Sequence, residues 1–239
     1  MLMECLYSPD LKQSDSSVIL SKDEEKHLRV LRLKDNEEIH LSNGKGLLAL
    51  AKVNFRNNAP IITPIEFYKN YGELKNKITV AICQIQSRER LEFLVEKAVE
   101  LGVVEIIIVH CDYSQKINIS EERLKNKAIA ALKQSHRSVL PQIKFEKSIQ
   151  SLISNIDKNI IPILLDENVD SPIKENITKD AIIFVGCEGG FSKSEIDAFN
   201  QIENLRRWNL GNRRLRAETA AIKAISILSA MLEVRNFEF

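Results

Sequence analysis

The chain has 239 residues, of which 44% are hydrophobic and 28% are charged, and its formal net charge is +1. This composition is typical of a globular protein with one large or two smaller domains, and it excludes an intrinsically disordered chain. No uninterrupted apolar stretch approaches the roughly 20 residues that a membrane helix needs. The N-terminal segment has neither the basic nor the apolar region of a secretion signal, so a cytoplasmic protein without a membrane anchor is expected.

The first 70 residues have the pattern of a small β-rich domain. Short apolar or alternating segments are candidate strands at 18–20, 38–41, 47–53 and 61–65. The segment Asn-Gly-Lys-Gly at 43–46 supplies the positive φ angles that a tight hairpin needs. A short helix is expected near Ser21, because the acidic residues that follow suit its N-terminal end. We predict a β-barrel over residues 1–70, with the polar stretch 68–77 as a linker.

From residue 74 onward the hydrophobic period changes from two to 3.6, and strands alternate with helices. Apolar runs predict strands at 78–84, 103–109, 160–165 and 181–185. Gly102 is placed where a helix ends, and Ser120 where the next helix begins. Ser192 with Glu195 forms a capping box, and the last helix is expected over about residues 218–234. The alternation predicts an α/β domain with a mainly parallel sheet over residues 74–239.

Two glycine-bearing segments each follow a strand pattern and open a helix. The first, GCEGGFS at 186–192, lacks the lysine of a phosphate-binding P-loop and the spacing of a dinucleotide fingerprint. Its Glu188 would repel a pyrophosphate, which favours a ligand other than a polyphosphate. The second, LGNRRLRAETA at 210–220, places Gly211 at the turn. Such turns let backbone amides approach a ligand closely, and two of them at one sheet edge predict a single pocket.

The second segment brings three arginines, Arg213, Arg214 and Arg216, to the start of the last helix. Cations are unfavourable there, because the N-terminus of a helix carries partial positive charge. We therefore infer a compensating anionic partner for these arginines. A surface network in which arginines and Glu218 neutralise one another stays open as the alternative.

The chain contains four widely separated cysteines: Cys5, Cys83, Cys111 and Cys187. They form no CxxC pair, so neither a zinc site nor a disulfide framework is predicted, and free thiols are expected. Cys83 and Cys111 are expected to be small core residues. His27 and His136 have no partner residues at ligand spacing, and no metal site is predicted.

The segments GCEGGFSKSEI and LGNRRLRAETAAIKAI, in this order near the end of the chain, resemble the RsmE-type ribosomal RNA uridine-N3 methyltransferases of the SPOUT superfamily. The likeness covers essentially the whole chain, through HLRVLRLKDNEEIHLSNGKG, RLEFLVEKAVELGV and ALKQSHRSVLPQI. It implies a PUA-like RNA-binding β-barrel at residues 1–70 and a SPOUT methyltransferase domain with a trefoil knot at 74–239. It also implies a homodimer that methylates N3 of one uridine in the 16S rRNA of the small ribosomal subunit.

In this family the cofactor, S-adenosylmethionine, lies in the knot and is held by three loops. Carried over to this sequence, the implied cofactor-binding residues are Leu165, Asp166, Glu167, Val185, Gly186, Glu188, Gly189, Gly190, Leu210, Gly211, Asn212, Leu215 and Thr219. The chain departs from the family at Cys187, which replaces a proline, and at Ala217, which replaces a threonine. It departs again at Arg214, where the family has an aliphatic residue, and at Ser87, where it often has a lysine. We interpret these as variation within the family.

Methylation of uridine N3 needs a cationic donor for the charge that spreads to O2 and O4, and a path for the N3 proton. Arg216 is the predicted donor, and Glu218 is the predicted proton acceptor or the orienting partner of that arginine. The residues predicted to contact RNA are His27, Arg29, Arg32, Arg88, Arg90, Lys97, Arg213 and Arg214. Lys97 has an alternative as a solvated residue on the polar side of its helix.

Two other functions stay open from the sequence alone. The departures at Cys187 and Ala217 are compatible with a non-catalytic RNA-binding or ribosome-assembly protein, which a cofactor-binding measurement distinguishes from an enzyme. A SPOUT methyltransferase with a different RNA target is the second alternative, and mass mapping of rRNA distinguishes it.

Overall fold

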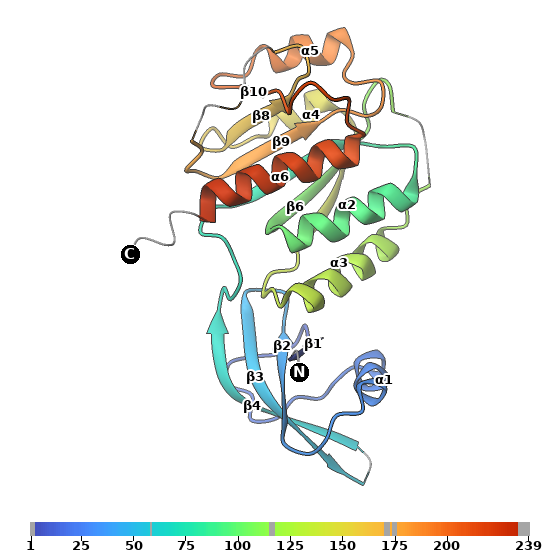
Figure 1. Ribbon diagram of the computed structural model, residues 1–239, viewed down its shortest axis with the longest axis vertical. Helices are drawn as coiled ribbons and strands as arrows, with labels where there is room; N and C mark the ends of the chain where they lie inside the picture. The colour runs from blue at the N-terminus through green and yellow to red at the C-terminus, as the bar shows by residue number, and fades with distance from the viewer. Residues whose placement is uncertain (1–2, 58, 115–117, 170–172, 174–175, 234–239) are drawn as a thin grey trace. The chain divides into compact units, whose positions relative to one another are not determined.

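The computed structural model describes residues 3–57, 59–114, 118–169, 173 and 176–233 (Figure 1). The chain divides into two compact units. The first contains Met1–Glu73 and Ala128–Leu140, and the second contains Leu74–Lys127 and Pro141–Phe239. The first unit is thus built from two separated parts of the chain, which the sequence did not indicate. Within the described residues, no helix combines the length and the apolar character needed to cross a membrane.

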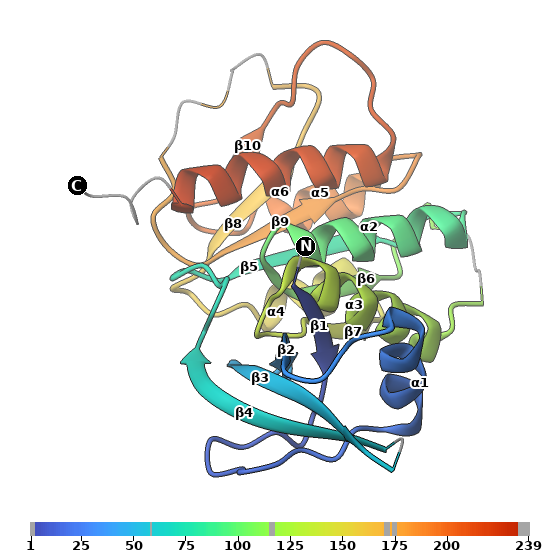
Figure 2. The same ribbon diagram turned by 60° about the horizontal axis from the view of Figure 1, so that its bottom comes forward.

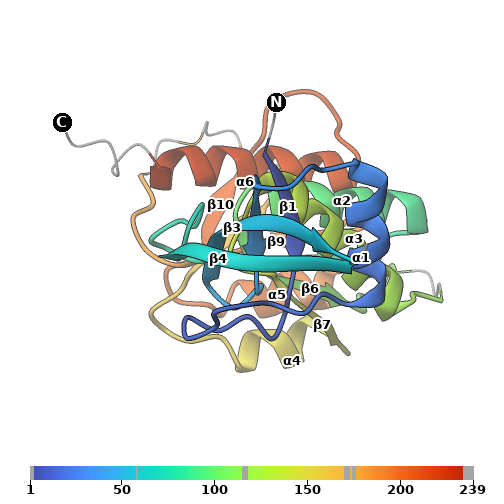
Figure 3. The same cartoon turned by 90° about the horizontal axis from the view of Figure 1, so that it is seen from below.

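A four-stranded sheet forms the centre of the first unit. The elements of this unit are β1 (Glu4–Tyr7), α1 (Lys22–Leu31), β2 (Glu37–Ser42), β3 (Leu47–Arg56) and β4 (Ala59–Lys69). The strand order is β1-β2-β3-β4, with β1 parallel to β2 and the other pairs antiparallel. Figure 3 shows β3 and β4 running side by side. Ile39, Leu41, Ala51 and Val53 alternate along their strands and are buried in the core of the unit, as the two-residue period of a strand requires.

The predicted hairpin at 43–46 is confirmed, and it joins β2 to β3. Gly44 and Gly46 both adopt positive φ angles, 68° and 97°. The side chain of Asn43 accepts a hydrogen bond from the backbone N–H of Leu47 at 3.0 Å, which closes the turn.

The helix expected near Ser21 is also confirmed, because the Ser21 hydroxyl caps α1 by accepting a hydrogen bond from the N–H of Glu24 at 3.2 Å. The strand predicted at 18–20 is wrong. Only Val18 pairs, through an isolated bridge with Ile62 of β4. β1 was not predicted, because four residues are too few to display a period.

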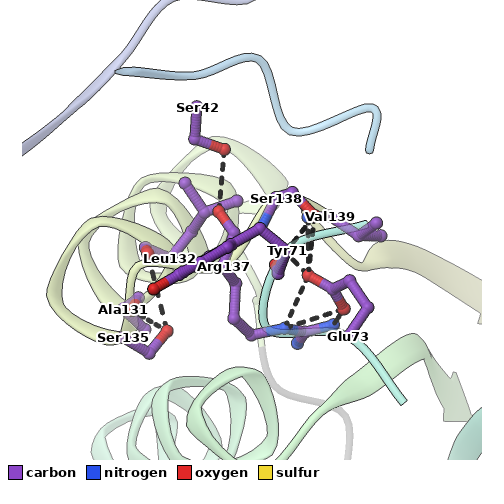
Figure 4. A network of polar contacts seen from close by, with 9 residues as sticks. All are labelled: Ser42, Tyr71, Glu73, Ala131, Leu132, Ser135, Arg137, Ser138 and Val139. Carbon is purple, nitrogen blue, oxygen red and sulfur yellow. Dashed lines mark hydrogen bonds and ion pairs between the residues drawn. The ribbon is translucent and has the colours of Figure 1, made fainter. Parts of the chain in front are cut away.

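A buried ion pair fixes the segment 137–139 within the first unit (Figure 4). The side chains of Arg137 and Glu73 are both buried, with exposed fractions of 2% and 6%. Nη2 of Arg137 donates a hydrogen bond to Oε2 of Glu73 at 2.5 Å. The same carboxylate accepts hydrogen bonds from the backbone N–H groups of Ser138 at 3.0 Å and Val139 at 2.8 Å. Ser42 donates its hydroxyl to the carbonyl of Arg137 at 2.8 Å.

Replacing Glu73 by glutamine is expected to destabilise the protein by about 3–5 kcal/mol, because it breaks a buried ion pair by removing one charge. The matching fall in melting temperature is roughly 10 °C for a chain of this size. Thermal melts of the full chain measure it. The double variant Glu73→Gln with Arg137→Met is the control, because it removes both charges while an amide oxygen still accepts from Ser138 and Val139, and it should recover much of the loss. A Glu73→Gln variant as stable as the wild type would contradict the assignment.

His40 and His136 form a second polar contact in the first unit. Their Nδ1 atoms lie 2.8 Å apart, so one ring donates and the other accepts. Burial lowers the pKa of His40 below its ordinary value of 6.5, and the charge of His136 lowers it further. Folded His40 therefore resists a proton that it would bind in the unfolded chain.

The free energy of unfolding is accordingly expected to decrease as the pH falls below about 6.5, because the unfolded chain then binds more protons than the folded one. Melting temperatures recorded from about pH 8 down to about pH 5 test this. His136 has a φ of 54°, a left-handed conformation that asparagine tolerates well. His136→Asn should therefore keep the backbone and flatten the pH dependence, and an unchanged slope in this variant would exclude the pair as its source.

A parallel six-stranded sheet forms the centre of the second unit. The strands are β5 (Ile78–Cys83), β6 (Val103–Val109), β7 (Gln142–Glu146), β8 (Ile161–Leu165), β9 (Ala181–Val185) and β10 (Arg206–Trp208). Their order is β10-β8-β9-β5-β6-β7, and every neighbouring pair is parallel. The predicted α/β fold with a mainly parallel sheet is confirmed. β7 is a strand that the sequence did not predict. A strand was expected to end at Leu210-Gly211, and the structure has the short strand β10 there, which ends earlier, at Trp208.

Helices cover both faces of this sheet. They are α2 (Arg88–Glu100), α3 (Glu121–Ser135), α4 (Ile149–Ser154), α5 (Lys193–Phe199) and α6 (Ala217–Glu233), of which α3 contributes its first seven residues, up to Lys127, to this unit. α2 and α6 lie side by side and pack on β5, β6 and β9 (Figures 1 and 2). On the other face, Ile149 and Leu152 of α4 and Phe199 of α5 pack with Ala81 and Phe184 of the sheet. Burial on both faces explains why these strands are continuous apolar runs.

The helix boundaries expected at Gly102, Ser120 and Ser192 are confirmed, whereas the expected end of the last helix at residue 234 lies outside the described residues. Ser120 accepts a hydrogen bond from the N–H of Arg123 at 3.3 Å at the start of α3, and Gly102 follows the end of α2 with a φ of 87°. Ser192 and Glu195 form the reciprocal hydrogen bonds of a capping box at α5.

The prediction of four free thiols is wrong for two of them. Cys83 and Cys111 are joined by a disulfide, with their Cα atoms 5.6 Å apart, whereas Cys5 and Cys187 are free and buried. Cys83 ends β5 and pairs in register with Val109 of β6, so the parallel pairing brings Cys111 beside it. Sequence spacing does not reveal this proximity, because the two cysteines are 28 residues apart.

Candidate functional site

Three loops of the second unit meet at the carboxyl edge of its sheet. β10, β8 and β9 are neighbouring parallel strands, so the segments that follow Leu165, Val185 and Trp208 leave the sheet on the same side. The backbone N–H of Asp166 donates to the carbonyl of Trp208 at 3.0 Å, which ties two of these segments together. The chain runs outward from β5 to β7 and then continues with β8 and β9 on the other side of β5. Ligands of open α/β sheets bind at such a reversal, beyond the carboxyl ends of the strands.

The loop after β9 is a tight turn built on glycine. The N–H of Gly190 donates to the carbonyl of Cys187 at 2.9 Å, and Gly190 has a φ of 73°. A Cβ added to Gly186 would lie 3.0 Å from the Cα of Gly190, so this close approach requires glycine. Burial raises the pKa of the Cys187 thiol, which keeps it protonated and makes it a packing residue of the turn.

A second loop that the sequence did not indicate supports this turn. The carboxylate of Asp112, just after β6, accepts hydrogen bonds from the hydroxyls of Ser192 at 2.5 Å and Ser194 at 3.0 Å. These bonds lower the pKa of Asp112. Next to it, the exposed side chain of Tyr113 lies 3.3 Å from the place where a Cβ on Gly189 would stand. An acidic residue three positions after the end of a buried strand was the available signal.

The loop after β10 is held by hydrogen bonds at Asn209 and Leu210, and its backbone is exposed at Gly211. Asn209 donates from Nδ2 to the carbonyl of Glu167 at 3.2 Å, and Lys223 donates from Nζ to the carbonyl of Leu210 at 2.6 Å. Gly211 has a φ of 104°, and a Cβ there would meet no atom within 4 Å. Arg207, one residue before Trp208, forms an ion pair with Asp166.

The three arginines of this loop are exposed: Arg213, Arg214 and Arg216. None of them forms an ion pair with another residue in the described ranges. The alternative of a self-neutralising network with Glu218 is therefore wrong. Glu218, the second residue of α6, is directed instead toward Arg90, whose Nε lies 3.7 Å from Glu218 Oε1.

Arg90 also contacts the loop after β9, because its Nη1 lies 3.5 Å from Oε1 of Glu188. The Glu218 side chain is 8% exposed. Its second oxygen, Oε2, is buried without a hydrogen-bond partner among the described residues. The structure thus brings Glu188, Glu218 and Arg90 together, although they were predicted to have three different roles.

The other predicted RNA contacts lie apart from this cluster. Arg88 is exposed at the start of α2 and lines a small cavity together with Arg123. Lys97 pairs with Glu100 at 2.8 Å and with Glu96 at 2.9 Å, and these hydrogen bonds raise its pKa. Leu215 is half-buried, and Asn212 and Thr219 are exposed.

The predicted RNA contacts of the first unit lie on α1 and at its end. Arg29 and Arg32 are exposed, and Arg32 ends the helix with a φ of 53°. His27 is half-buried, with its Nδ1 3.2 Å from the Nζ of Lys133. In the described parts of both units, no group of three or more His, Cys, Asp or Glu side chains is arranged to hold a metal ion.

Two family signatures show the class of protein to which this fold and these loops belong, the RNA methyltransferases. The signature of the RNA methyltransferase domain matches residues 72–229, and that of the RNA methyltransferase PUA domain matches residues 20–57. The chain belongs to the ribosomal RNA small subunit methyltransferase E family. A member from Rickettsia conorii is 31% identical over 221 residues, which cover 89% of each chain.

Solved structures of similar proteins have the same fold. A probable rRNA-methyltransferase from Porphyromonas gingivalis superposes with a TM-score of 0.84, at 29% identity over 98% of this chain and 100% of its own. A protein from Legionella pneumophila, solved in complex with the cofactor S-adenosylmethionine, superposes with a TM-score of 0.83. It is 25% identical, over 96% of this chain and 98% of its own.

Proposed function

We propose that this protein transfers the methyl group of S-adenosylmethionine to N3 of a specific uridine in the 16S rRNA of the small ribosomal subunit. The observation that carries the proposal is the meeting of the loops after β8, β9 and β10 at one sheet edge. Relatives named ribosomal RNA small subunit methyltransferase E support the substrate class. The Legionella structure, with S-adenosylmethionine bound, supports the methyl donor.

The residues at this edge fit that donor. No atom lies within 4 Å of a Cβ added to Gly190 or Gly211, so the backbone there is open to a ligand. The carboxylates of Glu188 and Glu218 share the single positive charge of Arg90, which leaves negative charge for a cationic ligand. When bound, S-adenosylmethionine supplies an electrophilic methyl group on a positively charged sulfur. We assign its binding to Leu165, Asp166, Glu167, Val185, Gly186, Glu188, Gly189, Gly190, Leu210, Gly211, Asn212, Leu215 and Thr219.

Arg216 and Glu218 would handle the charge and the proton of the uridine. The exposed guanidinium of Arg216 would donate to the uracil oxygens as negative charge develops on them. The free Oε2 of Glu218 would accept the N3 proton or hold the base in place. Positioning of the two reactants accounts for most of the remaining rate acceleration.

The uridine must leave its stack to reach this edge, as in other enzymes that modify bases. Phosphate contacts would hold the RNA while the base is turned out. We assign these contacts to His27, Arg29, Arg32, Arg88, Lys97, Arg213 and Arg214. Arg90, the remaining predicted contact, is considered separately below.

The proposal includes the architecture that the family resemblance implies. The bridge of Val18 to β4 supports a PUA-like barrel over residues 1–70. A trefoil knot in the SPOUT domain at 74–239 is supported by the path of the chain, because α6 follows the edge strand β10 but packs on the central strands β5 and β9. We further propose a homodimer that acts in the cytoplasm, where small subunits are assembled.

Two measurements test the function. Titration calorimetry should show saturable binding of S-adenosylmethionine. The protein should also methylate small subunits from a strain that lacks the modification, and mass mapping should place the methyl group on uridine N3. Binding without methyl transfer would favour the RNA-binding alternative, and a methyl group on another nucleotide would change the target.

A further inference from the structure

The guanidinium of Arg90 contacts two carboxylates at the sheet edge where we place the active site. Arg90, in the first turn of α2, lies 3.5 Å from Glu188 and 3.7 Å from Glu218. Glu188 belongs to the loop after β9, and Glu218 belongs to the first turn of α6. Arg90 therefore connects the segment assigned to the cofactor with the segment assigned to the uridine.

The carboxylate of Glu218 has an incomplete set of partners. Its Oε1 faces Arg90, whereas Oε2 is buried and has no hydrogen-bond donor among the described residues. A buried polar atom without a partner costs free energy, so native structures rarely leave one unpaired. An N–H group of a bound ligand would complete the hydrogen bonding of this oxygen. The N3–H of a uracil ring is such a donor.

Arginine suits this position better than lysine. Its planar guanidinium presents several N–H groups in a fixed geometry and can contact two carboxylates at once, whereas the lysine ammonium is a single point charge. The two carboxylates also outweigh the one positive charge, so the cluster as a whole repels a phosphate. Arg88, two residues earlier, is exposed and forms no ion pair within the described ranges, which leaves it available to RNA.

We propose that Arg90 is a positioning residue for methyl transfer and not an RNA phosphate contact. It holds Glu188 and Glu218 at a fixed separation, so that Oε2 of Glu218 faces the N3–H of the bound uridine. This inference rests on the proposed function of the same edge.

Three variants of the full chain, each compared with the wild type, test the role of Arg90. They are Arg90→Gln, Arg90→Lys and Arg88→Ala. For Arg90→Gln, kcat should fall on the order of 10²-fold, because small displacements of reacting groups have effects of that size. The KM for small subunits and the salt dependence of subunit binding should stay unchanged. Arg90→Lys should restore only part of kcat, because lysine reaches one carboxylate at a time. Arg88→Ala should show the opposite pattern, with unchanged kcat and a higher KM. Its salt slope, the slope of log K for subunit binding against log salt concentration, should be smaller by about one.

Glu188→Gln gives a second test in which Arg90 is retained. It should lower kcat less than Arg90→Gln does, and it should leave RNA binding unchanged. If Arg90 contacts phosphate, releasing it from Glu188 should instead tighten RNA binding. If Arg90→Gln fails to fold, as judged by circular dichroism and a thermal melt, this variant decides the question.

Wild-type kcat in Arg90→Gln, together with a smaller salt slope, would overturn the proposal and restore Arg90 as a phosphate contact. Full rescue of kcat by lysine would overturn it too. A wild-type protein that neither binds S-adenosylmethionine nor methylates subunits would instead refute the proposed function itself.

Discussion

Replacing Arg216 by alanine is expected to lower kcat for the methylation of small subunits by about 10²–10³-fold, as the loss of a donor to developing negative charge does in other enzymes. Arg216 directly precedes α6, is exposed, and forms no ion pair in the described part of the chain, so its guanidinium is free to meet a substrate. The uracil oxygens become fully charged only as N3 loses its proton. The lost interaction therefore belongs to the transition state, and the affinity for S-adenosylmethionine should change little.

Calorimetry with S-adenosylmethionine and steady-state methylation kinetics measure the two effects separately. Arg213→Ala is the matched control, because it removes an exposed arginine from the same loop. It should raise the KM for subunits and reduce the salt slope by about one. Unchanged turnover in Arg216→Ala would remove the residue from the mechanism, and equal effects in both variants would show that the loop only binds RNA.

The strands that carry the site were predictable because burial on both faces makes them continuous apolar runs. Ala181–Val185 and Ile161–Leu165 stand out from their polar surroundings on that account. The bounds of β10, the strand before the last loop, were not predictable. Arg206–Trp208 is a three-residue edge strand with two arginines, and hydrophobicity carries no signal for such a segment.

Contacts between distant residues could not be predicted from one sequence. The pairing of Arg90 with Glu188 joins residues 98 positions apart, and their charges alone are equally compatible with separate positions at the surface. The same holds for Ala128–Leu140. Its helical period predicts an amphipathic helix, but the period does not say that Arg137 reaches Glu73 in the first unit.

Replacing Gly190 by valine is expected to weaken the binding of S-adenosylmethionine by about 10²-fold, because a β-branched residue at positive φ costs about 1–3 kcal/mol. Gly190 has a φ of 73°, and its N–H closes the turn by donating to Cys187 at 2.9 Å. Relief of the strain requires rotation of this peptide, which breaks that hydrogen bond. The backbone of Val185–Gly190, assigned to the cofactor, then moves. Titration calorimetry measures the loss, and a thermal melt of the full chain checks that the fold persists.

Gly189 provides the control, because it shares the turn without the positive φ. A Cβ there would meet the side chain of Tyr113 at 3.3 Å, and an exposed side chain can yield by that small amount. Gly189→Ala should therefore weaken binding only a few fold, on the order of the 1 kcal/mol that a tight contact costs. If Gly190→Val binds the cofactor as the wild type does, the turn after β9 is not where the cofactor lies. If both variants lose binding equally, any side chain is excluded there, and the ligand itself lies against the turn.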